Sequence, residues 1–502
     1  MPPVRLHPWN IEIGKIGAPQ LPPVESLAQP PPEIAPGPHP SLPYENLAFE
    51  GGGVKGIAYV GALEVLEEVG LYPGHIRRVA GASSGSFLAS MVAVGCSSED
   101  LREMLAEHNL GAVMRDARFG MLSGIYNMLT VYGLNPGARL LRFLGDRLRE
   151  RTGSEDVTFQ QLLERCGREL CVPVTNITRM CTEYCHPKTT PDMPVRLAVG
   201  MSMSLPVLMA PYRLIRVLEE THETDLYTDG GLLCNYPIHA YDGWWLSLAP
   251  QDTYLSRLRP LSQMASHVHD LVRFQPSNPK TLGFTVFEQS EIDVSQRWTL
   301  PEGEAPKRPD TPLARARGER EAKLHDRSRM SQALGRAAER LMDAMAAVEI
   351  SGDGLISREE AEGLFRGGRL SPRDASLLFG TTDVHAIFDE LDHNGDGQIS
   401  YAELVRFIDS TNVPLTAHLA LARCEPKNVT SFISVMFQTV WAHMRRVTLH
   451  PEDRFRTVAI DTDYISTADF HMDPHDQAFL LETGRRATEA FLAHHHGLDP
   501  KR

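Results

Sequence analysis

Two short stretches near the start of the chain decide its fold: ENLAFEGGGVKG at residues 45–56 and IRRVAGASSG at residues 76–85. Each stretch begins with a short run typical of a strand and continues into glycine-rich text. Helical patterns follow both, the first over residues 56–69 and the second up to Val94. A strand, a helix, a second strand, a tight turn and a second helix are typical of a parallel sheet covered by helices. The sequence therefore predicts an α/β fold with helices on both faces of the sheet.

Further strand-like runs continue this pattern along the chain. They occur at residues 169–174, 196–199, 226–228 and, after a long interruption, 456–460. A closing helix is predicted around residues 477–494. We therefore expect the C-terminal segment to return to the first domain and complete it.

The pentad Gly81-Ala82-Ser83-Ser84-Gly85 fits the pattern GxSxG. Small residues around the central serine permit a strained turn between strand and helix that lifts its hydroxyl out of the sheet. Five-residue matches also arise in ordinary turns, but the position between a strand and a helix favours a nucleophile. We therefore predict Ser83 as the nucleophile and the amide of Ser84, at the start of the next helix, as an oxyanion donor.

The glycines at 51, 52 and 53 lie in a second turn between a strand and a helix. Residues without side chains can bring backbone N–H groups close to a developing negative charge, so Gly51, Gly52 and Gly53 are candidates for an oxyanion hole. Gly51, Gly53 and Gly56 also satisfy the GxGxxG spacing of a nucleotide-binding turn. The next strand lacks the acidic residue which that interpretation requires, and the serine pentad stands there instead.

Asp229-Gly230-Gly231 follows a predicted strand and supplies a candidate base. A carboxylate can accept the serine proton directly, and its two glycines let the backbone pass close to the serine. Because an ordinary aspartate is a weak base, we expect burial to raise the pKa of Asp229.

Together the elements GGGxKG, GxSxG and DGG, in this order, resemble those of the patatin-like phospholipase family. A small-residue stretch at 198–206 and the tripeptide Asn235-Tyr236-Pro237 add to the likeness, which covers residues 44–288 and resumes over 428–492. The resemblance implies a Ser83/Asp229 dyad, an oxyanion hole from Gly52, Gly53 and neighbouring amides, and acyl esters of lipids as substrates. The expected activity is that of a lipid acyl hydrolase of the phospholipase A or lysophospholipase type.

Two other interpretations remain open from the residues. Histidines follow Asp229, so an α/β-hydrolase esterase with a Ser-His-Asp triad is one alternative. A calcium-sensing scaffold without catalytic activity is the other. A cysteine-containing stretch, with Cys181, Cys185 and His186, admits a weaker zinc hypothesis, because a second pair of ligands is not evident.

A twelve-residue loop at 392–403 matches a calcium-binding EF hand at each informative position. Apolar residues on both sides suit an entering and an exiting helix, and Gly397 provides the sharp turn. The sequence therefore predicts a Ca²⁺ site whose ligands are Asp392, Asn394, Asp396, the Gln398 carbonyl, Ser400 and bidentate Glu403.

EF hands normally occur in pairs, and aligning Gly354 and Ile356 with Gly397 and Ile399 places an earlier loop at 349–360. A Glu in its first position and a Ser in its third make it a poorer calcium loop. We expect it to bind more weakly, or only to support its partner. Its candidate ligands are Glu349, Ser351, Asp353, the Leu355 carbonyl, Ser357 and Glu360.

Composition restricts the partners of this 502-residue chain. Its 50 Lys+Arg and 64 Asp+Glu give a formal charge of -14, which disfavours unspecific attraction to nucleic acid or to anionic lipid headgroups. An uninterrupted apolar run long enough to span a bilayer is not evident, so we expect at most peripheral contact with a membrane surface. Seven scattered cysteines are typical of reduced thiols and predict a cytoplasmic protein.

The apolar text at 110–134 has two interpretations: a lid or interfacial face beside the acyl pocket, or, as we favour, core packing.

Composition changes after residue 287, where text rich in Pro and charge precedes a long helical pattern over 313–348. We therefore predict a disordered Pro-rich leader (1–43), a hydrolase core (44–300), a basic linker and helix (301–330), an all-α EF-hand pair (331–411) and a return to the core (412–502).

Overall fold

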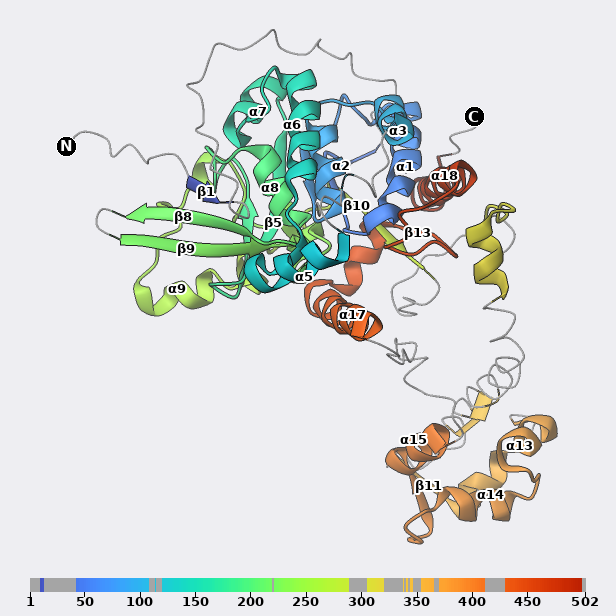
Figure 1. Cartoon of the computed structure of the whole chain (residues 1–502). Helices are drawn as coiled ribbons and strands as arrows, with labels where there is room; N and C mark the ends of the chain where they lie inside the picture. Colours follow the sequence, from blue (N-terminus) through green and yellow to red (C-terminus); the bar gives the residue numbers. More distant parts are fainter. Residues whose placement is uncertain are drawn as a thin grey trace. The chain divides into compact units, whose positions relative to one another are not determined.

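The computed structural model describes residues 10–12, 42–107, 113, 120–218, 221–288, 305–319, 337, 340–341, 344–345, 354–364, 370–410 and 429–498. The chain divides into two compact units (Figure 1). The first unit comprises residues 1–289, 297–311 and 426–502, and the second comprises 290–296 and 312–425. Residues of the first unit thus flank both segments of the second unit along the chain.

A nine-stranded mixed sheet forms the centre of the described part of the first unit. Its parallel strands are β5 (Glu169–Asn176), β3 (Arg78–Gly81), β2 (Asn46–Phe49), β10 (Thr281–Phe287) and β13 (Thr457–Asp461). Its antiparallel strands are β1 (Asn10–Glu12), β8 (Tyr212–Leu218), β9 (Thr221–Thr228) and β6 (Cys181–Cys185). The predicted α/β class, with a mostly parallel central sheet flanked by helices, is confirmed.

The C-terminal segment joins the sheet through β13, which pairs in parallel with β10. The register places Phe284 opposite Val458, although the two residues are separated by the whole second unit. After β13 the chain forms α18 (Pro474–His496), which packs against α1 (Ala58–Glu68). Two glycines permit this close contact, because a Cβ on Gly61 would lie 1.9 Å from the Leu481 carbonyl oxygen and one on Gly484 would lie 1.7 Å from that of Ala58.

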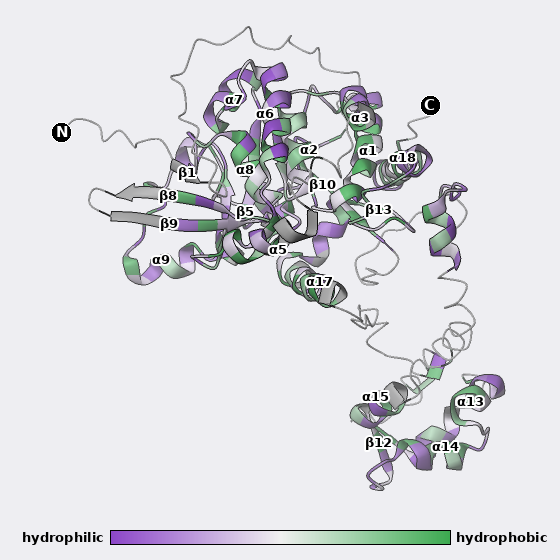
Figure 2. Ribbon diagram, in the orientation of Figure 1, coloured by the Kyte–Doolittle hydropathy of each residue, from purple (hydrophilic) through white to green (hydrophobic). Residues whose placement is uncertain are grey.

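Helices lie against the sheet, and α6 (Ala138–Thr152) and α7 (Phe159–Cys166) carry mostly hydrophilic residues (Figures 1 and 2). Besides α1, α6, α7 and α18, the helices of this unit are η1 (Gly53–Ile57), α2 (Ser84–Ala93), α3 (Ser98–Glu107), α5 (Gly120–Val131), α8 (Val195–Ser202), η2 (Gly230–Leu232), η3 (Ile238–Tyr241), η4 (Pro250–Asp252), α9 (Leu261–His267), α10 (Asp270–Arg273), α17 (Val429–Thr448) and η8 (Pro451–Arg456). A small second sheet pairs β4 (Gly133–Asn135) with β7 (Val207–Met209). A buried cluster on the main sheet joins Ala48, Ala80 and Cys171 of the central strands to residues from 234 to 246 and to Phe274.

The run at 196–199, predicted as a strand, is helical and lies within α8. Every residue of α8 is buried. Its sequence therefore lacks the regular alternation of apolar and polar positions that marks a helix exposed on one side. Pro194 at the N-cap marks the start of the helix. Short apolar runs do not distinguish a buried strand from a buried helix, which explains the error.

Several other expectations fall partly or wholly outside the described residues. Residues 10–12 of the expected leader form β1, and most of the leader lies outside. Residues 312–319 are helical, whereas most of the remaining pattern up to 348 lies outside the described part.

Among the described helices, none combines the length and apolarity needed to cross a membrane. All six cysteines in the described part are free thiols.

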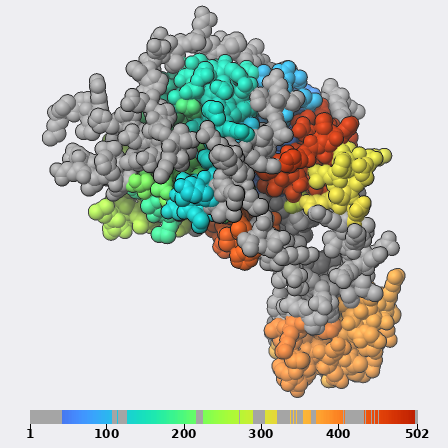
Figure 3. Space-filling view, viewed as in Figure 1, coloured from blue at the N-terminus to red at the C-terminus, as the bar shows by residue number. Residues whose placement is uncertain are grey.

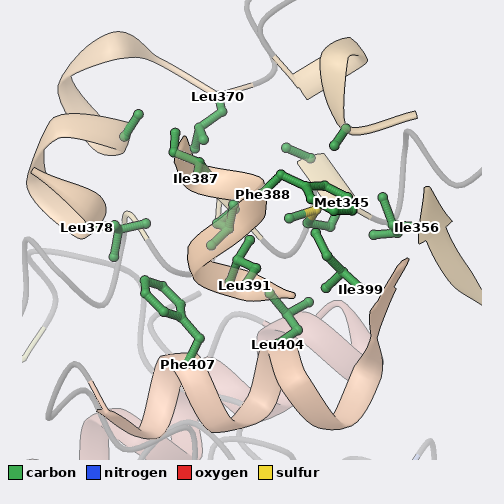
Figure 4. Packing of buried hydrophobic residues seen from close by; sticks show 14 of the residues in the cluster. Met345, Ile356, Leu370, Leu378, Ile387, Phe388, Leu391, Ile399, Leu404 and Phe407 are labelled. Atoms are coloured by element: carbon green, nitrogen blue, oxygen red, sulfur yellow. The ribbon is translucent and has the colours of Figure 1, made fainter. Parts of the chain in front are cut away.

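The second unit consists of short helices around one apolar cluster (Figure 4). Phe388 and Leu391, from the helix before the 392–403 loop, pack with Leu404 and Phe407 from the helix after it. Its elements are β11 (Leu355–Ser357), α12 (Arg358–Ala361), η7 (Glu362–Leu364), α13 (Pro372–Phe379), α14 (Val384–Leu391), β12 (Gln398–Ser400) and α15 (Tyr401–Ser410). The unit is helical apart from the two short strands.

Candidate active site

Ser83 lies in a sharp turn between β3 and α2. Its backbone has φ 50° and ψ −129°, a region that a residue with a side chain rarely occupies. The flanking glycines are required by space, because a Cβ on Gly81 would lie 2.1 Å from the Gly85 carbonyl oxygen, and one on Gly85 would lie 2.6 Å from that of Phe49. The turn leaves Ser83 only half-buried, while Gly81 and Gly85 are buried.

Asp229 follows the last residue of β9 and reaches the serine directly. The Ser83 hydroxyl donates a hydrogen bond of 2.9 Å to Asp229 Oδ2, and the Gly231 N–H donates one of 2.7 Å to Oδ1. The backbone of Asp229 is also fixed, since its N–H donates to the Ser204 carbonyl (3.0 Å) and its carbonyl accepts from Thr175 Oγ1 (2.8 Å). The carboxylate is therefore held on both oxygens and points at the nucleophile.

Burial changes the acidity of this carboxyl group. Asp229 is 2% exposed, and loss of hydration raises its pKa from 3.8 to about 7. The hydrogen bonds from Gly231 and Ser83 oppose this effect without cancelling it. A carboxylate with a pKa near neutrality is a stronger proton acceptor than an ordinary aspartate.

The glycine loop contributes fewer free amides than predicted. The Gly51 N–H donates to the Asn235 carbonyl (2.9 Å), and the Gly52 N–H donates to Ser84 Oγ (3.0 Å). The amides of Gly51 and Gly52 thus both have partners in the structure, and their role as oxyanion donors stays a prediction. For the N–H groups of Gly53 and Ser84 the described residues provide no acceptor, so these two remain candidates.

Three residues that hold the site in place were given no such role from the sequence, although Asn235 and the stretch that contains Ser202 contributed to the family resemblance. Ser202, at the end of α8, accepts the Ser83 N–H at 3.1 Å. Asn235 donates from its side chain to the Gly51 carbonyl at 3.0 Å and so ties the aspartate segment to the glycine loop. The Thr467 carbonyl accepts the Val54 N–H at 3.2 Å, which fixes the same loop from the C-terminal segment. The polar side chains of Ser202 and Asn235 were the only signal that could have indicated their roles, and Thr467 acts through its backbone carbonyl.

The triad alternative requires a histidine between serine and aspartate. In the described part of the chain, Ser83 bonds to Asp229 itself and histidine takes no part in that contact. His239, the first histidine after Asp229, is buried with its pKa lowered by burial to about 4, and its ring contacts the Tyr184 hydroxyl at 2.8 Å. Among the described residues, the contacts of Ser83 therefore lack the histidine that the triad alternative requires.

The zinc hypothesis also fails on geometry. Cys181 and Cys185 stand at the two ends of β6, and four residues of strand separate them by roughly 13 Å. His186 is buried and lies 3.2 Å from the Glu169 carboxylate. Cys181, Cys185 and His186, all within the described residues, therefore do not form a group that could hold a metal ion.

The 392–403 loop has the backbone and the oxygen groups of a calcium loop. Gly397 has φ +82°, the conformation that the sharp turn needs, and the Asp392 carboxylate accepts N–H groups from residues 395, 396 and 397. Glu403 reaches back across the loop and accepts the N–H groups of His393, Asn394 and Ser400, which lower its pKa and keep it ionised. Carboxylates, an amide oxygen and a main-chain carbonyl fit a hard cation such as Ca²⁺.

The first loop is only partly described, since Glu349, Ser351 and Asp353 lie outside the described residues. Its second half pairs with the second loop: β11 and β12 are antiparallel, with Ile356 opposite Ile399. This is the register expected from aligning the two loops. Glu360 accepts from Ser357 as Glu403 accepts from Ser400, so the two loops share their closing turn.

These features define an α/β hydrolase unit with a serine elbow, together with a helical unit of the EF-hand type. Residues 47–242 match the profile described as patatin-like phospholipase, and residues 384–408 match that of an EF hand. The chain therefore carries a patatin-like phospholipase domain and an EF hand.

Individual relatives are similar over the first domain. The chain is 34% identical over 202 residues to the uncharacterized protein YqhO of Bacillus subtilis, and 26% identical over 196 residues to a probable lipid hydrolase, 463L, of Invertebrate iridescent virus 6. Each match covers 39% of this chain, and 66% and 62% of the relatives, respectively. The crystal structure of VipD from Legionella pneumophila aligns with 97% of this chain and 70% of its own, at 14% identity and a TM-score of 0.37.

Proposed function

We propose that the first unit is a serine acyl hydrolase that cleaves ester bonds of lipids with Ser83 as nucleophile and Asp229 as base. The observation that carries this proposal is the 2.9 Å hydrogen bond from the Ser83 hydroxyl to a buried carboxylate whose pKa is raised to about 7. The strained backbone at Ser83 supports it, because such strain is retained where a reactive group must be exposed. The iridescent virus relative, a probable lipid hydrolase, supports the substrate class.

The proposed reaction has two steps. Ser83 Oγ attacks the ester carbonyl carbon while its proton passes to Asp229 Oδ2, and the resulting oxyanion accepts the N–H groups of Gly53 and Ser84. The C–O bond to the alcohol then breaks, and the alcohol leaves with the proton from Asp229. Water, deprotonated by the same carboxylate, hydrolyses the acyl-serine and restores the free hydroxyl.

The pH profile follows from the raised pKa. Only ionised Asp229 can accept the serine proton, so kcat/KM is expected to rise with pH through an apparent pKa near 7 and then level off. An ordinary aspartate would give a limb near pH 4 instead. The measurement is kcat/KM on a soluble monomeric ester between pH 4 and 9. A profile that is flat above pH 5 would contradict the assignment of Asp229 as the base.

A covalent probe tests the nucleophile independently of the substrate. We expect a fluorophosphonate to label the full-length chain at one peptide, the one that contains Ser83, because only an activated serine reacts readily. Ser83→Ala should abolish labelling, whereas Ser86→Ala, which changes a hydroxyl bonded to the Ser83 carbonyl three residues away, should remain labelled. A properly folded chain that fails to react would instead favour the catalytically silent scaffold.

We further propose that the loop at 392–403 binds Ca²⁺ and that this binding regulates the hydrolase rather than taking part in the chemistry. A dyad with its own oxyanion donors does not need a metal to polarise the ester. The second unit is inserted between β10 and β13, which are neighbours in the sheet, so both of its ends are anchored to the hydrolase. After this insertion comes α17, which packs against η2, the turn directly after Asp229. A calcium-induced change at the end of the insertion can therefore reach the dyad through the chain connection to α17 and the packing of α17 against η2.

A further inference from the structure

Four large apolar side chains are exposed on elements that contact one another next to the dyad. They are Tyr126 (65% exposed) and Leu129 (76%) of α5, Tyr132 (55%) just before β4, and Leu208 (41%) of β7. We call them the α5–β7 patch. Core packing, the interpretation favoured for 110–134, therefore does not account for Tyr126, Leu129 and Tyr132, whereas residues 110–112 and 114–119 of that segment lie outside the described part. Figure 3 shows α5, in cyan, at the surface of the hydrolase unit.

Hydrogen bonds hold this patch together and connect it to the site. Asn127 of α5 donates to the Leu134 carbonyl at 3.1 Å, and Asn135 of β4 donates to the Leu208 carbonyl at 3.0 Å. β7 begins three residues after Ser204, whose carbonyl accepts the Asp229 N–H. The patch is therefore built on the backbone that positions the proposed base.

Backbone strain is concentrated in this small sheet. Tyr132, just before β4, has φ +66°, and Val207, the first residue of β7, has φ +73°. A positive φ is costly for a β-branched residue such as valine. Gly133 is needed between them, because a Cβ there would lie 2.3 Å from the backbone of Met209 and Ala210. Exposed apolar side chains held on a strained support are more consistent with binding than with packing.

The charges around the patch differ from those of the whole chain. Asp and Glu are both absent from residues 117–145 and 195–218 in a protein with 64 acidic residues and a net charge of -14. The charged residues of these two segments are all arginines. Arg139 and Arg142 are exposed at the start of α6, and the Arg213 guanidinium lies 5.5 Å from the centre of the Tyr132 ring. Arginine beside exposed Tyr and Leu suits an interface that is apolar at its centre and anionic at its rim.

We infer that the α5–β7 patch docks the hydrolase on the surface of a bilayer that contains anionic phospholipids. This inference rests on the proposed lipid hydrolase function and specifies how the enzyme meets its substrate. Tyr126, Leu129 and Leu208 enter the boundary between headgroups and acyl chains, while the arginines contact phosphate groups. Docking on this side places the elements that support Asp229 against the lipid.

The test measures vesicle binding without hydrolysis. The full-length chain carrying Ser83→Ala is co-sedimented, at fixed calcium, with phosphatidylcholine vesicles that contain or lack phosphatidylserine. We expect tighter binding to the anionic vesicles, and at least about a tenfold loss of that binding in Tyr126→Ser/Leu129→Ser, because two buried apolar side chains are removed from the interface. Both positions are exposed, so the melting temperature should stay within about 2 °C of the parent.

Phe455→Ser is the matched control. Phe455 is 55% exposed on η8, which leads into the amino end of β13. The dyad lies at the carboxyl end of β3, and because β3 and β13 run parallel in the sheet, Phe455 and the dyad are at opposite ends of the strands. Its binding should change less than about twofold. Equal binding by parent and double variant, equal binding to both kinds of vesicle, or a loss confined to self-association would overturn the inference. Because the serine is absent throughout, a failure of the hydrolase proposal in the probe experiment is distinguishable from a failure of docking.

Discussion

Replacing Ser83 by alanine or Asp229 by asparagine is expected to lower kcat for ester hydrolysis by at least about 10⁴-fold, with little change in KM. The serine supplies the attacking oxygen, and the aspartate is the only proton acceptor in the described part of the chain that contacts it. Since the two side chains act as one unit, the double variant should be scarcely worse than either single variant. Turnover of a soluble monomeric ester by the purified proteins checks this. Retained activity in Asp229→Asn, together with loss on replacing a histidine, would restore the triad alternative.

Stability provides the control for the aspartate variant. The pKa of Asp229 is about 7 in the folded chain and near 3.8 when it is exposed, so folding favours its protonated form. The stability that this carboxyl group contributes is present below about pH 4 and is lost as pH rises through about 7. Asparagine does not ionise, so Asp229→Asn should gain stability relative to the parent between pH 4 and pH 8. Thermal unfolding at both pH values thus separates an inactive folded enzyme from an unfolded one.

The motifs found in the sequence and the geometry of the site agree best where local backbone chemistry decides the structure. The glycines of the serine pentad are required by contacts with Gly85 and Phe49 carbonyls, and such a requirement is visible as a motif. The paired loops of the second unit are likewise predictable, because a fixed loop length sets the register of Ile356 against Ile399.

Contacts made by ordinary residues from distant segments could not be predicted in this way. Ser202 accepts the Ser83 N–H from a helix whose apolar text suggested a strand, and Thr467 holds the glycine loop from the C-terminal segment. The hydrogen bond from the Gly51 amide to the Asn235 carbonyl is of the same kind and gives this predicted oxyanion donor a partner within the fold. Neither periodicity nor a motif encodes which backbone group lies opposite another in the fold, because that depends on the packing of the whole sheet.

Replacing Glu403 by glutamine is expected to weaken calcium binding to the second unit by at least about tenfold. Glu403 closes the loop by accepting the N–H groups of three loop residues, and as a carboxylate it would supply a charged, bidentate ligand. Glutamine keeps the length of the side chain but not its charge. Glu390→Gln is the matched control, because Glu390 is an exposed residue of α14 outside the loop. Calorimetric titration of the full-length chain with Ca²⁺ should distinguish the two variants.

The same pair of variants decides whether calcium regulates the hydrolase. If it does, calcium should change the hydrolysis of phospholipid vesicles by the parent and by Glu390→Gln, and Glu403→Gln should lose that response at the same calcium concentration. The basis for this expectation is the chain connection from the insertion to α17, which packs on the turn after Asp229. Activity on a soluble ester, measured with calcium and with chelator, shows whether calcium acts on the dyad or only at the lipid surface. Equal activity under all conditions, with calcium raising only the melting temperature, would make the second unit a structural support for the hydrolase.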